Sequence, residues 1–545
     1  MLPSNELAMF AIQKSFEGPS INRCLYSRIR RVKCGEEKPE CQRCLKFGVK
    51  CDGYLPLCKD LKRAASNRGI PPRNQKRSEI SPNFLASLSV ASLGTEKEQR
   101  YFDLFYGQTS LEIMPAHDSF TTRQMLLQAC YSDSSIKHAI IALGALDKTA
   151  EITRDFNKLS LDNFPKAESI ATNEHHQFAL EEYTKAVADM RKGNTLKDVR
   201  TTLLSILLIF IFEAWNGNMA MAVRQIRNGV RIIQEWKATI KDADKTSENM
   251  SPAPQIVEHD LIRIFSRLVI QTSYFYNQGF TFEDLRTIYA NQGREYLESM
   301  PTNFATIEES VHYHQAIFKR GTIFFAAFVA EPPLPGSDLA VELASEKNFT
   351  ITKTAQWLKA FEPLFDAFKS GYSMYEGRLV RNIKAQIMIC DVILCTCFMD
   401  QTIYDSYNNM FSEIVDLLEQ SLEMQPVSGR SRPTNYSLAG RAVSTLWITG
   451  IRCRDKIIRR KAMELLLKYP RREGVWDGLF SAKIMKFVMD LEEQYLEDDY
   501  VPGWARISAI RWDADLEKRA ATLICEQRVS SSSDEIVTRT RTIIW

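Results

Sequence analysis

Six of the twelve cysteines fall between residues 24 and 58, where their spacing suits a metal better than a disulfide. Cys41 and Cys44 form a C-x2-C pair, which lets two thiolates from one tight turn bind the same tetrahedral zinc ion. The first twenty residues carry Glu6 and Glu17 and lack a basic start and a clean apolar stretch, so we expect no secretory signal and reduced thiols. The cysteine cluster therefore predicts a structural zinc site.

The positive charge of the chain is concentrated around this cluster. Residues 21 to 77 contain sixteen Lys and Arg against five Asp and Glu, a net charge of +11, while the whole chain carries +3 and the remainder therefore about −8. A basic segment beside a near-neutral body is typical of a nucleic-acid-binding module attached to a larger protein. A solvated basic surface or a nuclear import signal would have a similar composition, and either is compatible with DNA contact.

The spacing of the cluster is Cys24-x2-Ser27-x6-Cys34-x6-Cys41-x2-Cys44-x6-Cys51, embedded in the stretches RIRRVKC, KPEC and CLKFGVKCDGY. Apart from Ser27, this segment resembles the fungal binuclear zinc cluster, Zn(2)-Cys(6), of fungal transcription factors. The resemblance implies two zinc ions bridged by Cys24 and Cys41, and a short helix that enters the major groove of double-stranded DNA at a CGG triplet. The implied metal ligands present in this chain are Cys24, Cys34, Cys41, Cys44 and Cys51.

One of the two implied zinc sites lacks a ligand. Four thiolates would complete the site of Cys44 and Cys51, whereas the other site would contain three thiolates and Ser27, whose hydroxyl is a poor zinc ligand at neutral pH. We therefore expect one full site of four cysteines and a weaker second site. Gly35, in place of the aspartate that often follows the third cysteine, is a second departure. A misassigned exon boundary over the first 40 codons would produce the same departures.

Other donors for the incomplete site are a water molecule, Cys58 or a nearby glutamate. Cys58 lies seven residues beyond Cys51 and after Pro56, so it would have to fold back across the cluster, and a free thiol is the better interpretation. The glutamates that stand near the third cysteine are Glu36, Glu37 and Glu40.

The basic residues that the resemblance places on DNA are intact. Arg31 stands four residues after position 27, where the family usually has the residue that contacts bases, and arginine makes a bidentate contact with guanine O6 and N7. The other cations are expected to position the module on phosphates. The predicted DNA-binding residues are Arg28, Arg30, Arg31, Lys33 and Arg43.

The remainder of the chain reads as mainly α. Helical spacing of apolar residues begins near Glu96, strand signals are scarce, and stretches such as LLIFIFEAWNGN and RRKAMELLLKYPRREGVWDG resemble the helical regulatory region of the same factors. The predicted domains are a disordered lead-in at 1–20, a Zn(2)-Cys(6)-type DNA-binding module at 21–56, a linker at 57–94, an all-helical regulatory domain at 95–526 and a tail at 527–545.

Four helical segments carry specific predictions. Residues 203–212 read as a core helix, because ten apolar residues are too few to cross a bilayer. Residues 132–146 are expected to begin at a Ser132 or Asp133 cap, and residues 219–233 to pair an apolar stripe with an exposed arginine face. Residues 452–461 read as a solvated basic face.

Outside the cluster, no residues point to catalysis or to a second metal. Cys390, Cys395 and Cys397 lie in an apolar helical setting without a nearby histidine, so we expect core thiols. The histidine pairs His175 with His176 and His312 with His314 are expected to be surface or core residues.

Together these features predict a nuclear regulator of RNA polymerase II genes that reads CGG-type sites through a zinc cluster, acts with co-regulators, and is not an enzyme. The resemblance also admits a homodimer, a role in a secondary-metabolite gene cluster, and no membrane association. The alternative is an interaction protein whose degenerate zinc cluster no longer binds DNA.

Overall fold

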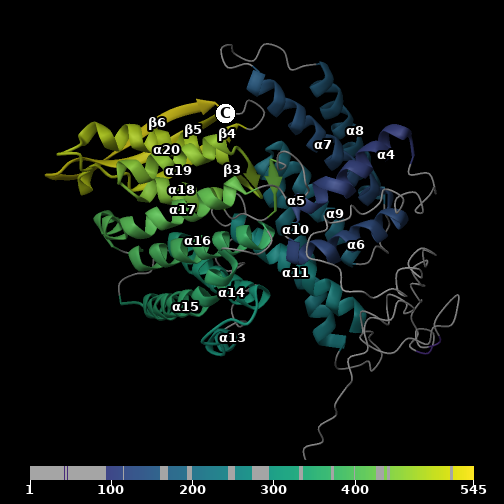
Figure 1. Ribbon diagram of the computed structural model, residues 1–545, viewed down its shortest axis with the longest axis horizontal. Coiled ribbons are helices and arrows are strands. Elements are labelled where there is room, and N and C mark those ends of the chain that lie inside the picture. The colour runs from purple at the N-terminus through teal and green to yellow at the C-terminus, as the bar shows by residue number, and fades with distance from the viewer. Residues whose placement is uncertain are drawn as a thin grey trace, which may run out of the picture. The chain divides into compact units, whose positions relative to one another are not determined.

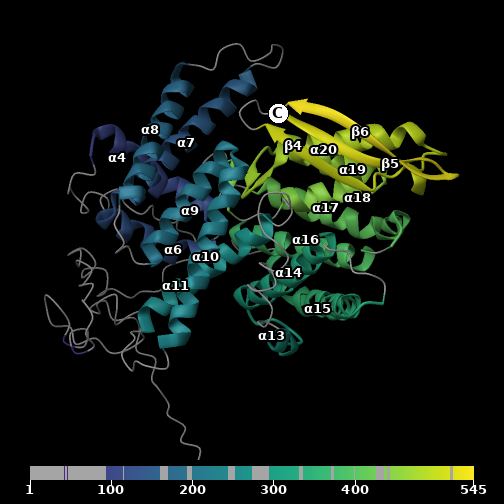
Figure 2. The same ribbon diagram turned by 180° about the vertical axis from the view of Figure 1, so that it is seen from behind.

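The computed structural model describes residues 42, 46, 94–114, 116–159, 170–192, 199–243, 252–272, 294–330, 336–369, 374–397, 399–424, 435–438, 442–515 and 520–544. The chain divides into two compact units, residues 1–90 with 243–259 and residues 91–242 with 260–545. Nearly all described residues belong to the second unit, which Figures 1 and 2 show from opposite sides.

Helices dominate the described part of the second unit, which confirms the predicted mainly α fold. The first half contains α4 (Glu96–Leu104), the π-helix η2 (Phe105–Thr109), α5 (Ser110–Ile113), α6 (Ala116–Ser132), α7 (Ser134–Leu159), α8 (Ile170–Lys192), α9 (Val199–Asn216), α10 (Met219–Ala243) and α11 (Pro252–Thr272), whose residues 252–259 belong to the first unit. The second half contains α13 (Arg294–Glu298), α14 (Ile307–Ala330), α15 (Asp338–Lys369), α16 (Met374–Thr396), η4 (Gln401–Tyr407), α17 (Asn408–Glu423), α18 (Val443–Arg452), α19 (Lys456–Lys468), α20 (Gly478–Glu492), η5 (Glu493–Tyr495) and η6 (Gly503–Ala505).

Local sequence explains where these helices begin. The Thr95 hydroxyl accepts from the Glu98 backbone N–H while the Glu98 carboxylate accepts from the Thr95 N–H, a capping box that starts α4 at Glu96. Asp133 caps α7 by accepting from the backbone N–H groups of Ser135 and Ile136 at 2.9 and 3.3 Å. The structure thus selects Asp133 from the two predicted caps.

The predicted core helix and the predicted stripe are confirmed. Residues 203–215 of α9 are all buried, and although α9 is long and apolar enough to cross a membrane, 72% of it is buried inside the protein. On α10, Val223, Ile226, Val230 and Ile233 are buried while Arg224, Arg227 and Arg231 are exposed. Both helices contribute to the core of a globular body.

A small sheet joins helices that are far apart in sequence. Strand β1 (Tyr436–Ser437) pairs in parallel with β2 (Arg472–Glu473), which pairs antiparallel with β3 (Trp476–Asp477). The Trp215 ring at the end of α9 stacks on Tyr436, and its indole N–H donates to Asn435 at 2.8 Å. The guanidinium of Arg472 donates to the Trp215 carbonyl, so α9 is tied to this sheet from two sides.

The C-terminal residues form a second sheet, so the prediction of an all-helical region followed by a tail at 527–545 was wrong about local structure. Strands β4 (Ala509–Asp515), β5 (Ala520–Ser530) and β6 (Ser533–Ile544) pair antiparallel in that order. Burial alternates along β5, and the serine run forms the hairpin turn between β5 and β6 rather than a loose end. The sheet lies beside α20 and α19 (Figure 1).

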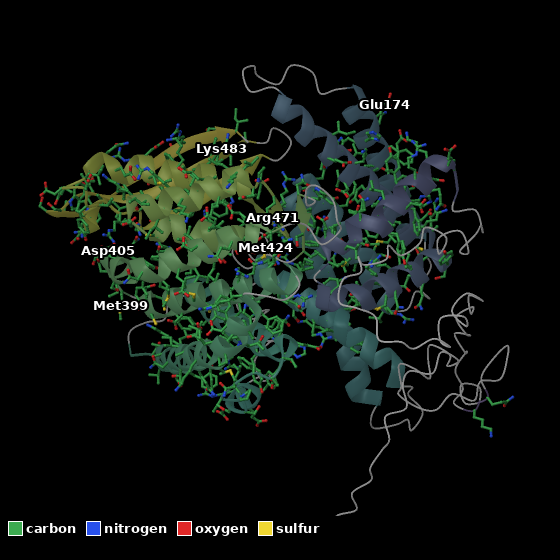
Figure 3. The ribbon with its side chains drawn as sticks, in the orientation of Figure 1. Glu174, Met399, Asp405, Met424, Arg471 and Lys483 are labelled. Atoms are coloured by element: carbon green, nitrogen blue, oxygen red, sulfur yellow. The ribbon has the colours of Figure 1, made fainter. Side chains whose placement is uncertain are left out.

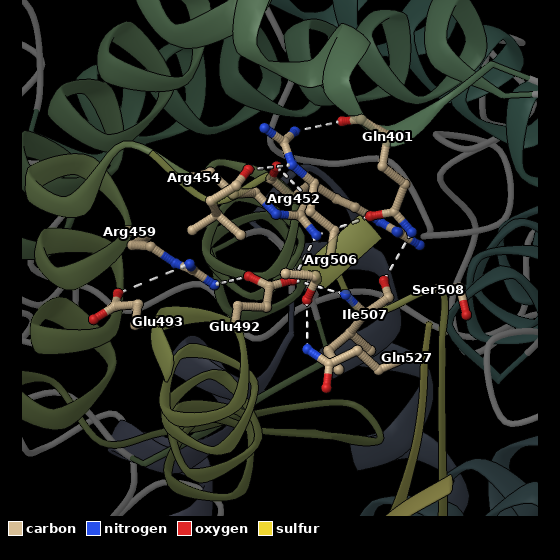
Figure 4. Close-up of polar contacts among 12 residues, drawn as sticks. Gln401, Arg452, Arg454, Arg459, Glu492, Glu493, Arg506, Ile507, Ser508 and Gln527 are labelled. Atoms are coloured by element: carbon tan, nitrogen blue, oxygen red, sulfur yellow. Dashed lines mark hydrogen bonds and ion pairs between the residues drawn. The ribbon is translucent and has the colours of Figure 1, made fainter. Parts of the chain in front are cut away.

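The charged segment 452–461 contains buried arginines, which corrects the prediction of a solvated face. Arg454 and Arg459 are 5% and 0% exposed, and both donate to the buried carboxylate of Glu492, at 2.7 and 2.9 Å (Figure 4). The same carboxylate accepts the backbone N–H of Ile507 at 3.0 Å. Burial alone would raise the pKa of Glu492, but the two guanidinium charges outweigh it and lower the pKa, which keeps the carboxylate ionised.

We predict that Glu492→Gln lowers the free energy of unfolding by about 3–5 kcal/mol, because it removes the nearest counter-charge of two buried guanidinium groups. Urea denaturation of the full chain, followed by circular dichroism, measures this change.

The neighbouring Glu493→Gln is the matched control. Glu493 binds Arg460, whose side chain is 42% exposed, at 2.6 Å and reaches the buried Arg459 only at 3.9 Å, so its loss should cost about 1 kcal/mol, less than the loss of Glu492. Equal effects of the two substitutions would contradict a special role for the buried Glu492 carboxylate.

Candidate functional site

The predicted zinc and DNA-binding residues lie outside the described residues. These are Cys24, Cys34, Cys41, Cys44 and Cys51, together with Arg28, Arg30, Arg31, Lys33 and Arg43. Their roles therefore stay predictions. Within the segment, Gln42 and Lys46 are described, and both are helical and exposed.

Gln42 stands between Cys41 and Cys44, and Lys46 follows Cys44 by two positions, so both described residues lie at the predicted C-x2-C pair.

The donor chemistry of the cluster suits zinc. Four cysteines would supply one complete tetrahedral thiolate site, which is the donor set that structural zinc prefers. Ser27 leaves the second site with three thiolates. The residues present therefore fit one zinc ion fully and a second only in part.

Among the described residues of the helical body, one group has metal-ligand chemistry, at Glu98, His138 and Glu182. Their ligand atoms lie within 4.8 Å of one another. However, the His138 imidazole hydrogen-bonds Glu182 at 2.7 Å, and the Lys185 ammonium donates to Glu182 at 2.6 Å. Glu98 also accepts the Thr95 backbone N–H at 2.6 Å. Because Lys185 already supplies the positive charge, we interpret the group as a network that fastens α4, α7 and α8. Sequence reasoning missed it, since its members lie about 40 residues apart.

Of the three cysteines predicted to be core thiols, Cys390 and Cys397 are buried and Cys395 is half-buried. Cys390 and Cys397 are 6% and 8% exposed and pack with Phe324, Leu343 and Leu394. Burial raises the pKa of Cys397 to about 11 and raises the pKa of Cys390 further. Zinc binds the thiolate, so these raised pKa values disfavour metal binding there.

The histidine pairs serve packing and hydrogen bonding. His175 contacts the Tyr101 hydroxyl at 2.5 Å, and His176 contacts the Asn216 amide oxygen at 3.2 Å. His314 is buried and stacks on Phe318. Each of these three imidazoles thus has a structural neighbour, as expected for surface or core residues.

Comparisons with known proteins bear on the N-terminal segment and on the whole chain. The model of the fungal Zn(2)-Cys(6) binuclear cluster domain matches residues 23–59. The aspercryptin biosynthesis cluster-specific transcription regulator atnN of Emericella nidulans is 22% identical over 574 residues, covering 88% of each chain. The transcription regulator lscL of Purpureocillium lilacinum is 26% identical over 247 residues, covering 42% of this chain and 52% of that relative. No solved structure matches.

These comparisons confirm the resemblance to fungal Zn(2)-Cys(6) transcription factors that the cysteine spacing predicts. The match to the first relative extends far beyond the 37 residues of the domain, so the helical body shares in the similarity. The domain implies zinc binding, whereas the number of zinc ions stays a prediction.

We predict that alkylation separates the two classes of cysteine. After zinc removal at neutral pH, iodoacetamide should label the cysteines of residues 24–58 and leave Cys390 and Cys397 unlabelled, because the buried thiols form almost no thiolate. Peptide mapping by mass spectrometry reads out each site. Denaturation in urea is the control that should expose the buried thiols, and their rapid labelling in the folded chain would contradict the described packing.

Proposed function

We propose that this chain, which carries a fungal Zn(2)-Cys(6) binuclear cluster domain and resembles transcription factors of that type, is a nuclear, sequence-specific DNA-binding regulator of RNA polymerase II genes. The observation that carries the proposal is the presence of five cysteines at the family spacing within the matched residues 23–59. In this proposal Cys24, Cys41, Cys44 and Cys51 hold one zinc ion, and Cys34 contributes to a second, weaker site.

The concentration of positive charge in the N-terminal segment supports the proposal that this segment binds DNA. A net charge of +11 over residues 21 to 77 attracts the phosphate backbone and releases counterions, so binding should weaken as salt rises. Arg28, Arg30, Lys33 and Arg43 would position the module on phosphates, which carries no sequence information. Arg31 would read guanine in a CGG triplet through a bidentate contact.

The described helical body suits a regulatory rather than a catalytic part. Its buried Glu492 carboxylate is bound by two arginines, and burial raises the pKa of its Cys390 thiol. The two relatives, atnN and lscL, are both named as transcription regulators, and atnN is named for a biosynthesis cluster. We therefore propose that the body controls the module or recruits co-regulators, that the chain is not an enzyme, and that its targets include a secondary-metabolite gene cluster.

We predict that Arg31→Ala removes most of the preference of the full chain for CGG over scrambled duplex DNA. Loss of one bidentate contact should reduce discrimination by about 1–3 kcal/mol, which corresponds to roughly five- to 150-fold in affinity ratio. Fluorescence anisotropy titrations across salt concentration measure both duplexes. Arg68→Ala, in the basic stretch beyond the matched domain, is the control and should weaken both duplexes equally.

The second candidate function is that of an interaction protein whose finger no longer discriminates bases, and Ser27 with Gly35 favours it. A three-thiolate site should hold its zinc weakly and leave the DNA-reading helix poorly ordered.

Ser27→Cys distinguishes the two candidates. If the finger is degenerate, this substitution should raise the zinc content toward two ions per chain and create CGG selectivity that the natural chain lacks, since it completes the sixth ligand. Elemental analysis and the same anisotropy titrations measure both quantities. Selective binding by the natural chain, unchanged in the variant, would support the regulator and contradict the degenerate finger.

A further inference from the structure

The outer edge of β6 pairs with no other described strand. The strand order β4, β5, β6 leaves β6 at an edge, with no further described strand beside it. β6 is 12 residues long, from Ser533 to Ile544, and contains neither lysine nor proline. Natural edge strands are usually short or protected by such residues or by a bulge, because alternate N–H and C=O groups point outward and accept another strand. In β6 a register irregularity lies before Ile536, between the pairs with Arg528 and Ser530, and the pairing with β5 is regular from Ile536 to Ile544.

The sequence of β6 is complementary to itself in the antiparallel direction. Its first half carries Asp534 and Glu535, and its second half carries Arg539 and Arg541. If two copies pair about a two-fold axis at Val537, Glu535 of each copy stands directly opposite Arg539 of the other. Residues directly opposite in an antiparallel pair lie on the same face of the sheet. The two-fold axis therefore gives two equivalent ion pairs between Glu535 and Arg539.

The two charged side chains that this pairing brings together, Glu535 and Arg539, form no ion pairs with other described residues. The Glu535 carboxylate makes no hydrogen bond or ion pair with another described residue, and the Glu535 backbone N–H donates to Ser533. Arg539 donates to the Tyr495 hydroxyl at 3.3 Å and forms no ion pair with another described residue. By contrast, Arg541 already binds Asp490 at 3.2 Å. A carboxylate opposite Arg539 would satisfy the group that the body leaves without a counter-charge.

Other registers and the other edge fit less well. A shift that centres the pair on Thr538 would set Val537 against Arg539 and bring Glu535 to Arg541, whose charge Asp490 already balances. The opposite edge strand, β4, spans seven residues, and its Arg511 is ion-paired with Glu526. The longer strand with the unbalanced charges is therefore the better partner for a second copy.

We propose that two copies of this chain associate through their β6 edges, antiparallel and centred on Val537, to form a continuous six-stranded sheet. The Ile536 side chain, 56% exposed, then lies opposite Thr538 of the partner copy on the solvent face of the sheet. The helix α20 anchors the strand from the other face, where Ile543 is buried and Lys483, labelled in Figure 3, donates to the Ile544 carbonyl. This inference does not depend on DNA binding or on the zinc content.

Sedimentation velocity on the full chain without DNA tests the proposal. The natural chain should dimerise, and Glu535→Arg or Arg539→Glu alone should raise the dimer dissociation constant about tenfold or more, because each turns two attractive pairs into two repulsive ones. The double variant should restore the dimer, since it exchanges the charges across the axis. Asp513→Arg on β4 is the matched control, with the same change of net charge as Glu535→Arg on an exposed edge residue, and should leave the dimer unchanged.

A covalent measurement keeps the proposal testable if a charge variant fails to fold. Val537→Cys should form a disulfide between copies under mild oxidation, identified by peptide mapping, because opposed residues of an antiparallel pair lie at a distance that a disulfide spans. Each of four results would overturn the proposal. The natural chain could be a monomer, or both single charge variants could leave the dimer unchanged. The double variant could fail to restore association, or the Val537→Cys variant could form no crosslink.

Discussion

The buried carboxylate of Glu492 is the interaction on which the C-terminal half of the body depends. Arg454 precedes α19, Arg459 lies within α19, Glu492 ends α20, and Ile507 leads into β4, so one ionised group joins four parts of the chain. A buried charge of this kind is retained only where every partner is in place, because its desolvation is costly. Its geometry therefore fixes how α19, α20 and the start of the C-terminal sheet meet.

The network continues from this carboxylate through a glutamine. Gln401 accepts from Arg454 at 2.8 Å, donates to the Ile507 carbonyl at 2.7 Å, and accepts at its own carbonyl from Arg506 (Figure 4). Arg506 also binds Asp405 within η4 at 2.6 Å. Backbone groups before β4 that would otherwise be unsatisfied in the interior are thus paired with side chains. The irregular chain between α20 and the sheet is held by these contacts rather than by regular secondary structure.

Sequence reasoning located what is encoded locally. The buried stripe of α10 and the core helix α9 follow from apolar spacing, and the Asp133 cap follows from a residue type at one position. In the same way, Cys41 and Cys44 point to zinc because both ligands stand within one turn of chain. Such features are readable because the interacting residues are neighbours in sequence.

The features that sequence reasoning missed depend on partners far away in the chain. Arg459 looks like a solvated residue in a basic run until Glu492, 33 positions later, is placed beside it. The serine run looked like a mobile tail because its role as a hairpin turn requires knowing that β5 pairs with β6. The Glu98, His138 and Glu182 group is hidden for the same reason, since its three residues come from three helices.

The cysteine-rich segment and the helical body differ in what can stabilise them. A cysteine-rich segment of about 36 residues is too small to bury a sufficient core, so in the proposed function its folding energy would come from zinc. The helical body buries a large set of apolar side chains and, among them, the ionised Glu492. Through Ile507 that group positions β4, and through β5 it positions the edge strand β6. The C-terminal sheet thus begins two residues after a backbone N–H that the buried Glu492 carboxylate holds.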